Sequence, residues 1–252
     1  MVTGSTQKKD AEAAFWDKVA QERIYAAFDK EEYESYIDSL GKDLTGKTIV
    51  DIGSASGVSA ALFAARGAIV YGIDISPELI AQAKTLWPEY EDRLHFQVGD
   101  AENLDFEDNS VDACFFGGVL HHFPERERVY AEAARILKPG GRFIAVEPNR
   151  LNGLELIEWG IADLRGKLSP NEYPIDPQVM KSEMMAHGFS PVNFVPVRFD
   201  IPFLAQLPLL RYGFSRQKGF WFKRPMLKFI DAFRAPENRG TFFVIDGVKK
   251  NG

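Results

Sequence analysis

The stretch TIVDIGSASGVSAALFAARGAIVYGIDIS, residues 48–76, decides the fold. It holds an apolar run around Asp51, a turn with Gly53 and Gly57, a helical pattern, and a second apolar run around Asp74. This order is typical of a strand, a helix and a parallel strand in one βαβ unit. An acid at the end of the second strand, about 20 residues beyond the first glycine, is where nucleoside-binding folds hold ribose hydroxyls. We therefore expect Asp74 to bind a nucleoside.

The glycines of this turn argue against a dinucleotide. A G-x-G-x-x-G fingerprint that starts at Gly53 needs glycine at the positions held by Ala55 and Val58. The chain instead has the pattern D-x-G-x-x-x-G, formed by Asp51, Gly53 and Gly57. The sequence thus disfavours an oxidoreductase that uses NAD or FAD.

Composition limits the other classes of function. The chain of 252 residues is long enough for one α/β domain with insertions. Its net charge of −6 argues against a broad nucleic-acid surface, which needs clustered cations. The single cysteine, Cys114, lies in an apolar run and is expected in the core, and no Cys/His cluster has metal-ligand spacing. Because no run approaches the ~18 apolar residues of a spanning helix and the N-terminus has no apolar signal region, we expect a cytoplasmic protein.

Strand and helix patterns alternate along most of the chain. Ser76 followed by a proline predicts a capped helix start, and the KPGG turn at 138–141 predicts a helix end. Helices are expected over 11–40, 76–87, 124–137 and 176–188, and strands over 69–75, 94–100, 111–119, 142–149, 191–200 and 241–250. Nearly continuous apolar strands of this kind favour a parallel sheet with helices on both faces.

Six short motifs, in order and with suitable spacing, resemble the class I S-adenosylmethionine (SAM)-dependent methyltransferases, particularly the type 11 small-molecule group. They are FWDKVA, VDIGSASG, GIDIS, GDAENLDF, VLHHF and LKPGGRFIAVEPN. The resemblance covers residues 13–150 well and the last helix and strand more weakly. It implies a Rossmann-like α/β fold whose seven-stranded sheet has the order 3-2-1-4-5-7-6, with only the last strand antiparallel. It also implies SAM as cofactor, S-adenosylhomocysteine as product, and no metal.

The same resemblance suggests how the chain is organised. Helices would cover both faces of the sheet, and helical insertions would form a lid. The expected parts are an N-terminal helical cap (1–45), the SAM-binding core (46–150), an acceptor-side insertion (151–175), and the C-terminal part of the core (176–252), which carries a basic aromatic insertion at 201–240.

The resemblance also implies a set of cofactor-binding residues. These are Tyr25, Asp51, Gly53, Ser54, Gly57, Asp74, Ile75, Asp100, Ala101, Gly117 and Gly118. Asp51 would position the turn or reach the amino group, Asp74 would accept from both ribose hydroxyls, and Asp100 would accept from the adenine amine. The turn departs from the family pattern at Ala55, where a glycine is usual, and we expect the extra methyl group to be tolerated.

The other cofactor residues have weaker signals. Ile75 would pack on the adenine face, Gly117 and Gly118 would leave room near the transferred methyl group, and Tyr25 would lie near the methionyl group. For each of them, packing or turn formation is the alternative role.

Three residues are candidates for catalysis. His121 and His122 follow the fourth expected strand, and a histidine acts as a general base near neutral pH. Glu147 ends the fifth expected strand and would hold an acceptor group or deprotonate a carbon acid. The alternatives are that a histidine caps or orients the loop, that Glu147 pins Asn149 or the following loop, and that alignment of the reactants alone drives transfer.

The segment 201–240 is unusual in composition. It carries eight Lys or Arg against two acids, a net charge of +6, which leaves −12 for the rest of the chain, and it has eight aromatic residues. It fits an interfacial element on an anionic membrane, a lid over an apolar acceptor, or a helix packed on the sheet or a dimer contact. Residues 150–175 would form the opposite wall of the acceptor pocket, with Trp159 and Tyr173 as candidates.

These features predict a methyltransferase that moves a methyl group to an O, N or C atom of a small, hydrophobic molecule. It would act as a monomer or homodimer and bind no nucleic acid. One alternative is a membrane-surface methyltransferase of a lipid-linked or quinone-like substrate, in peripheral contact with the membrane through 201–240. An alternative from another class is a SAM-binding module without catalysis. The sequence does not identify the acceptor.

Overall fold

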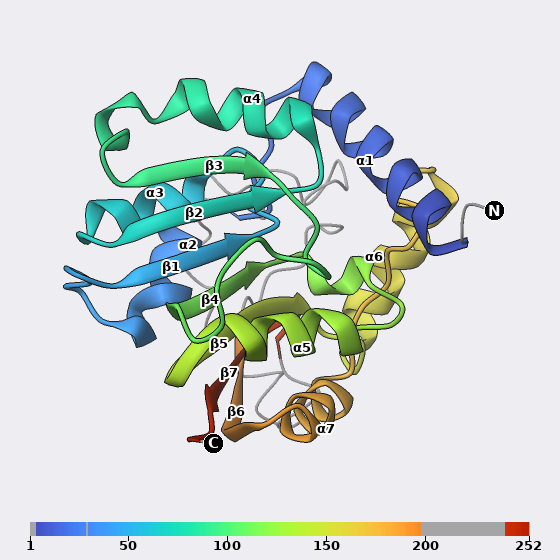
Figure 1. Ribbon diagram of the computed structural model, residues 1–252. Coiled ribbons are helices and arrows are strands. Elements are labelled where there is room, and N and C mark those ends of the chain that lie inside the picture. Colours follow the sequence, from blue (N-terminus) through green and yellow to red (C-terminus); the bar gives the residue numbers. More distant parts are fainter. Residues whose placement is uncertain (1–3, 29, 198–239, 252) are drawn as a thin grey trace, which may run out of the picture.

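A single seven-stranded sheet organises the chain. The computed structural model describes residues 4–28, 30–197 and 240–251 (Figure 1). The strands are β1 (Thr48–Ile52), β2 (Ile69–Asp74), β3 (Leu94–Val98), β4 (Val111–Gly117), β5 (Leu137–Pro148), β6 (Phe189–Val197) and β7 (Phe242–Lys249). Their order is β3-β2-β1-β4-β5-β7-β6, and β7 runs antiparallel to both of its neighbours. The expected order and the single antiparallel strand are confirmed.

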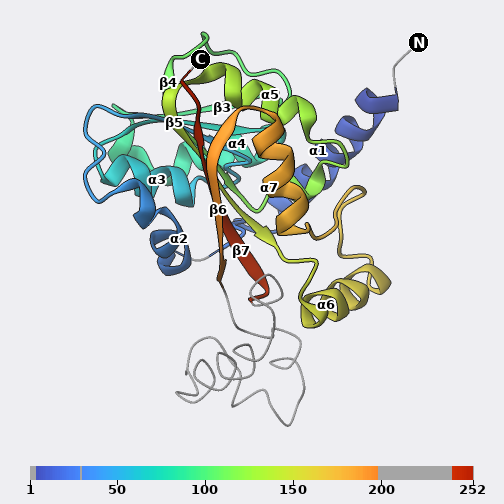
Figure 2. The same cartoon turned by 90° about the horizontal axis from the view of Figure 1, so that it is seen from below.

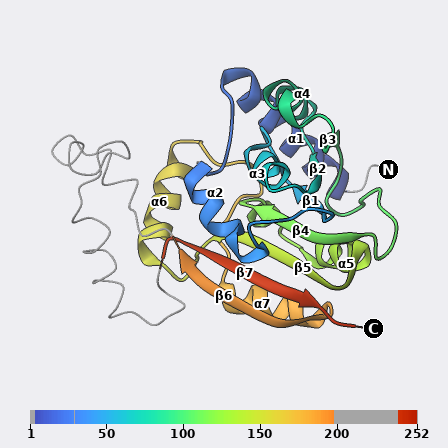
Figure 3. The same ribbon diagram turned by 90° about the vertical axis from the view of Figure 1, so that its left-hand side faces the viewer.

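Helices cover both faces of this sheet, as expected (Figure 3). They are α1 (Gly4–Glu22), α2 (Lys30–Ile37), α3 (Val58–Ala65), α4 (Pro77–Leu86), α5 (Glu127–Ile136), α6 (Gly153–Leu164) and α7 (Pro177–Ala186), with short 3₁₀ turns η1 (Asp38–Leu40), η2 (Pro88–Tyr90) and η3 (Leu120–His122). The helices α2, α3 and α4 contribute to one apolar core, and α5 and α7 contribute to the other. Figure 2 shows α7 running alongside β6.

Side-chain alternation along β4 shows why both faces are apolar. Ala113 and Phe115 enter the core beneath α2 and α3, whereas Cys114 and Phe116 enter the core beneath α5 and α7. All four are almost fully buried, so the prediction that Cys114 is a core residue is confirmed. Because successive residues of a strand point to opposite faces, a strand buried on both sides must be apolar throughout.

The N-terminal helix differs from its prediction. The expected helix over 11–40 is divided into α1 and α2, with a non-helical link between them. In this link the carbonyl oxygen of Tyr25 accepts a hydrogen bond from the backbone N–H of Ser56, 3.2 Å away, in the glycine turn. The chain therefore leaves the helical path where it crosses the turn, because a carbonyl used there is not available to a helical hydrogen bond.

Helix α1 lies across the carboxyl-terminal edge of the sheet, beside α4 (Figure 1). Polar contacts hold it there. The Asp17 carboxylate accepts from the Ser76 hydroxyl at 2.5 Å, and the Gln82 side chain donates to the Ala20 carbonyl oxygen. The cap predicted at Ser76 is present, since its hydroxyl accepts from the Leu79 N–H at 3.1 Å. The helix α1 thus has the place that a lid over the strand ends would have.

Other element boundaries shifted by a few residues. Strand β5 begins at Leu137, so the residues expected to form the KPGG turn belong to it, and its pairing with β4 is irregular near Val111. The insertion 201–240 lies outside the described residues, apart from Gly240. Among the helices that the structure describes, none has both the length and the apolar character needed to cross a membrane.

The glycine turn yields a testable prediction about packing. Gly57 has a φ of +81°, and a Cβ atom on it would lie 2.3 Å from Phe96 Cζ. Gly140 has a similar φ of +78° but open space around it. We expect Gly140→Ala to cost about 1–2 kcal/mol of unfolding free energy from backbone strain alone, and Gly57→Ala to cost clearly more. Urea unfolding of both variants measures the difference, and equal losses would contradict the packing role of Gly57.

Candidate active site

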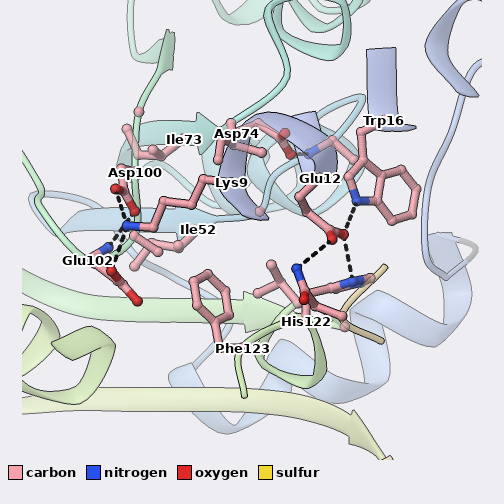
Figure 4. Close-up of a pocket in the computed structure, with 18 of the residues that line it drawn as sticks. Lys9, Glu12, Trp16, Ile52, Ile73, Asp74, Asp100, Glu102, His122 and Phe123 are labelled. Carbon is pink, nitrogen blue, oxygen red and sulfur yellow. Dashed lines mark hydrogen bonds and ion pairs between the residues drawn. The ribbon is translucent and has the colours of Figure 1, made fainter. Parts of the chain in front are cut away.

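A cavity of about 420 Å³ opens at the carboxyl-terminal edge of the sheet, beneath α1 (Figure 4). Nine residues expected from the sequence line it: Tyr25, Gly53, Asp74, Ile75, Asp100, Ala101, Gly117, Gly118 and His122. Five expected residues do not line it: Asp51, Ser54, Gly57, His121 and Glu147. Ala55, where the turn departs from the family pattern, also lines it, and the wall includes residues for which the sequence predicted no site role, among them Lys9, Glu12, Trp16, Val119, Phe123 and Asn171.

The glycine turn is held by the end of β2. The backbone N–H groups of Gly53 and Ser54 both donate to the Ile73 carbonyl oxygen, at 2.8 and 3.0 Å. Ala55 has a φ of +48°, in the left-handed region where glycine is favoured, and its N–H donates to Asp74 Oδ2 at 2.9 Å. The backbone of Ala55 is therefore strained by its methyl group, and the residue lines the cavity.

Two buried carboxylates stand behind this turn. Burial raises the pKa of Asp74 to about 6, although the N–H groups of Ser76 and Ala55 counteract the shift. Burial likewise raises the pKa of Asp51 to about 7, with partial compensation from the Ser59 hydroxyl, which donates to Oδ2 at 2.6 Å. The second oxygen, Asp51 Oδ1, has no hydrogen-bond partner among the described residues. Because Asp51 does not line the cavity, the energetic cost of this unsatisfied acceptor falls on the folded protein itself.

On the opposite wall, α1 contacts two acids that follow β3. The ammonium group of Lys9 lies 2.6 Å from Asp100 Oδ2 and 2.5 Å from Glu102 Oε2 (Figure 4). Partial burial would lower the pKa of Lys9, but the two carboxylates outweigh this effect and raise it. Lys9 thus donates to the carboxylate that the sequence assigned to the adenine amine.

Glu147 organises the loop after β4. Its carboxylate is fully buried and accepts from three successive backbone N–H groups, those of Val119 (3.1 Å), Leu120 (2.8 Å) and His121 (3.2 Å). It also lies 2.7 Å from His121 Nδ1. In this position Glu147 pins the loop after β4, whereas the sequence suggested that it would pin Asn149 or the loop beyond it. Glu147 does not line the cavity.

The two adjacent histidines have opposite protonation. Burial would lower the pKa of His121, but hydrogen bonds and charges from Glu147 and Glu172 outweigh it and raise the pKa to about 9. His121 is therefore a cation at neutral pH and has no free lone pair for a base. Burial and the positive charge of His121 lower the pKa of His122, although Glu12 opposes them. His122 is neutral and lines the cavity.

Aromatic rings surround this end of the cavity. The ring centroids of Trp16 and Tyr25 lie 4.7 Å apart, and Trp16 and His122 form a T-shaped pair with 5.5 Å between ring centroids. Burial raises the pKa of Tyr25 to about 12, so its phenol stays protonated. Trp159 packs against His121 instead, 5.6 Å between ring centroids, and neither it nor Tyr173 lines the cavity.

The residues missed by sequence reasoning come mainly from α1. Lys9, Glu12 and Trp16 follow one another at spacings of three and four, which places them on one face of a helix. This spacing was available in the sequence, but a polar face is ordinarily read as solvent-exposed. Only the placement of α1 over the strand ends turns that face toward the cavity.

Comparison with known proteins agrees with this architecture. Residues 50–145 match the family described as Methyltransferase domain. Phosphoethanolamine N-methyltransferase 2 of Caenorhabditis elegans is 34% identical over 110 residues, which are 43% of this chain and 25% of that protein. The 27-O-demethylrifamycin SV methyltransferase of Amycolatopsis mediterranei is 37% identical over 100 residues, 38% of this chain and 37% of that protein. The chain thus spans less than half the length of these curated relatives.

A solved structure gives a longer match. Phosphoethanolamine N-methyltransferase 2 of Haemonchus contortus, in complex with phosphomonomethylethanolamine and S-adenosylhomocysteine, aligns with a TM-score of 0.64 and 20% identity. The alignment covers 88% of this chain and 53% of that chain. The strand order and the cavity at the strand ends define a class I, Rossmann-like methyltransferase fold. Within that class, the family match extends over residues 50–145, and the aligned Haemonchus contortus enzyme was solved in complex with S-adenosylhomocysteine.

The pKa of Asp51 predicts how stability depends on pH. Because the folded pKa of about 7 exceeds the unfolded value of 3.8, the stabilising effect of its bound proton is complete below pH ~4. That effect is lost as the pH rises through 7. We expect Asp51→Asn to be more stable than the parent at pH 8 by about 1–3 kcal/mol, the cost of an unsatisfied buried acceptor.

Urea unfolding without cofactor, at pH 5 and pH 8, measures this difference. The gain should be much smaller at pH 5, where Asp51 is already protonated. A variant less stable than the parent at pH 8 would show that the carboxylate is satisfied in the folded protein.

Proposed function

We propose that the chain is a SAM-dependent methyltransferase whose acceptor is a small, hydrophobic molecule that carries a removable proton on the methylated atom. The observation that carries this proposal is the meeting, at one cavity, of the glycine turn with Asp74 and a neutral, buried His122. The glycine turn and Asp74 suit a nucleoside, and His122 suits proton removal from an acceptor. A non-catalytic SAM-binding module would not need a base such as His122.

The residues present fit the cofactor. Asp74 and Asp100 place carboxylates on the cavity wall, where the ribose hydroxyls and an amine of a bound SAM would supply donors. The Gly53 position admits no side chain, since a Cβ there would lie 2.5 Å from Val119 Cγ2. When bound, SAM supplies an electrophilic methyl group on a positively charged sulfur.

Each wall of the cavity has a role in this proposal. Asp74 would hold the ribose hydroxyls, and Ile75 would cover one face of the adenine. Gly117 and Gly118 leave the end of β4 free of side chains near the reacting atoms. Phe123 gives the acceptor side an apolar surface, which excludes water from the reaction.

His122 would accept the proton that the acceptor loses. Its neutral state at pH 7 leaves one ring nitrogen unprotonated, as a base requires. The nearby cation His121 would not compete for that proton, because it is already protonated. Alignment of the acceptor by the cavity would supply the remaining rate enhancement.

The basic segment favours a second candidate, a methyltransferase that takes its acceptor from a membrane surface. Its charge of +6 and eight aromatic residues suit an anionic interface. Co-sedimentation with vesicles tests this directly. Binding to anionic but not to neutral vesicles would support the membrane candidate, and no binding to either would exclude it.

The cofactor site is tested by Asp74→Asn. Losing a charged hydrogen-bond acceptor should weaken SAM binding by about 10- to 100-fold, measured by calorimetry. Asp112→Asn is the matched control, because Asp112 also accepts a backbone N–H at a strand end but lies at the opposite edge of the sheet. Equal affinities in the two variants would place the ribose elsewhere.

The reaction is tested by supplying methyl-labelled SAM together with metabolite and lipid extracts of the host. We expect a labelled small molecule to form, and its identity gives the acceptor and the methylated atom. His122→Gln should lower the rate of labelling by about 10²-fold or more while SAM affinity stays within twofold. Tight SAM binding without any labelled product would favour the non-catalytic module.

A further inference from the structure

Glu12 of α1 is a carboxylate buried in the wall of the cavity. It is 8% exposed, and its Oε1 lies 3.0 Å from His122 Nδ1 and 3.0 Å from Trp16 Nε1. Its Oε2 accepts from the side-chain amide of Asn171 at 3.3 Å. Figure 4 shows the carboxylate between the indole and the imidazole. Three partners from three segments of the chain therefore fix its position.

This contact determines which nitrogen of His122 carries the proton. Burial would raise the pKa of Glu12, but the hydrogen bond from His122, the charge of that ring when it is protonated, and hydrogen bonds from Ser169 and Trp16 outweigh it and lower the pKa, so the group is ionised at neutral pH. An ionised carboxylate only accepts hydrogen bonds. A carboxylate oxygen 3.0 Å from Nδ1 favours a proton on Nδ1, because without it the lone pairs of the two atoms would repel each other. The neutral ring then has its lone pair on Nε2, for which no hydrogen bond is present among the described residues.

Ser169 offers the same nitrogen a different partner. Its hydroxyl lies 2.9 Å from His122 Nδ1 and can either donate or accept. Without Glu12, the hydroxyl is free to donate to Nδ1, which would place the ring proton on Nε2. The position of Glu12 thus selects between the two tautomers. Because Glu12 belongs to α1, that selection depends on α1 lying across the cavity.

We propose that Glu12 is a positioning residue that holds His122 in its Nδ1–H form, so that the base is complete only while α1 covers the cavity. This inference rests on the proposed function. In the step it serves, the acceptor's proton passes to Nε2 and the acceptor's lone pair forms the bond to the methyl carbon. The electron pair of the broken carbon–sulfur bond stays on sulfur. Glu12 then faces the imidazolium and balances its charge.

Two other charged groups near His122 shift its pKa, in opposite directions. The His121 ring lies against it, tilted by 38° with 4.1 Å between centroids, and as a cation opposes its protonation. Glu172 favours its protonation from the loop beyond His121. Neither group hydrogen bonds to His122 among the described residues, so neither selects the nitrogen that carries the proton. That selection is left to Glu12 and Ser169.

The test uses the whole protein saturated with S-adenosylhomocysteine and needs no acceptor. Imidazole ¹H–¹⁵N correlation spectra report which nitrogen of each of the four histidines is protonated, and His122→Gln assigns the signal. The parent should show His122 as the Nδ1–H form at pH 7.5. In Glu12→Gln and Glu12→Ala the ratio of Nδ1–H to Nε2–H should fall about tenfold or more, as expected for loss of a charged hydrogen bond.

Asp10→Asn is the matched control, because it removes an exposed carboxylate from the same helix, two residues away. It should leave the tautomer ratio unchanged. Ser169→Ala, which keeps Glu12 but removes the rival donor, should retain the Nδ1–H form. Ser169→Ala also tests the proposal if the Glu12 variants fail to fold. A shift of its His122 toward the Nε2–H form would overturn the proposal.

The lid part of the proposal is tested by Lys9→Met, which breaks the ion pairs of α1 with Asp100 and Glu102 and leaves Glu12 intact. It should raise the Nε2–H fraction of His122, and the added change Ser169→Ala should reverse that rise. An unchanged tautomer ratio in Glu12→Gln would overturn the inference even if labelled product forms. Absence of labelled product would instead count against the proposed function, whatever the tautomer.

Discussion

The carboxylate of Asp74 joins the two strand ends on which the site is built. One oxygen accepts from the N–H of Ala55 in the turn after β1, and the other accepts from the N–H of Ser76 at the start of α4. Ionisation of a buried carboxylate is costly, and these backbone donors reduce that cost. The same hydrogen bonds hold the turn in a left-handed conformation at Ala55, which an L-residue adopts at an energetic cost. A cofactor that donated further hydrogen bonds to the Asp74 carboxylate would offset the remaining cost of its burial.

The loop after β4 shows how neighbouring residues of the same type acquire different chemistry. Glu147 gathers three backbone N–H groups and the ring of His121, so His121 is charged and serves the structure. Burial, together with that charge against its ring, lowers the pKa of His122 and keeps it neutral. His121, His122 and Glu172 each offer an atom that could hold a metal ion, within 4.8 Å of one another. In the described residues, however, these groups are engaged with one another and with Glu147, Glu12 and Ser169.

Helix α1 contributes charged groups rather than a broad apolar face to the cavity. Lys9 contacts the acids beyond β3, Glu12 contacts His122, and Asp17 contacts the cap of α4. Apolar packing adds to these contacts, since Trp16 and Ala20 of α1 form a small cluster with Leu79 of α4. Charged contacts and packing together hold α1 over the strand ends.

The sequence by itself determined the sheet and the nucleoside side of the cavity, because those features depend on local patterns. Apolar runs, the spacing of Gly53 and Gly57, and an acid at the end of β2 all lie within one βαβ unit of 29 residues. Only the tertiary structure decided the roles of His121, His122 and Glu147, since these depend on which charges meet in the interior. It also revealed Glu12, which lies 110 positions before His122 and contacts it only because α1 crosses the strand ends. A pKa, a tautomer and a contact between distant segments are set by burial and packing, and no local pattern carries that information.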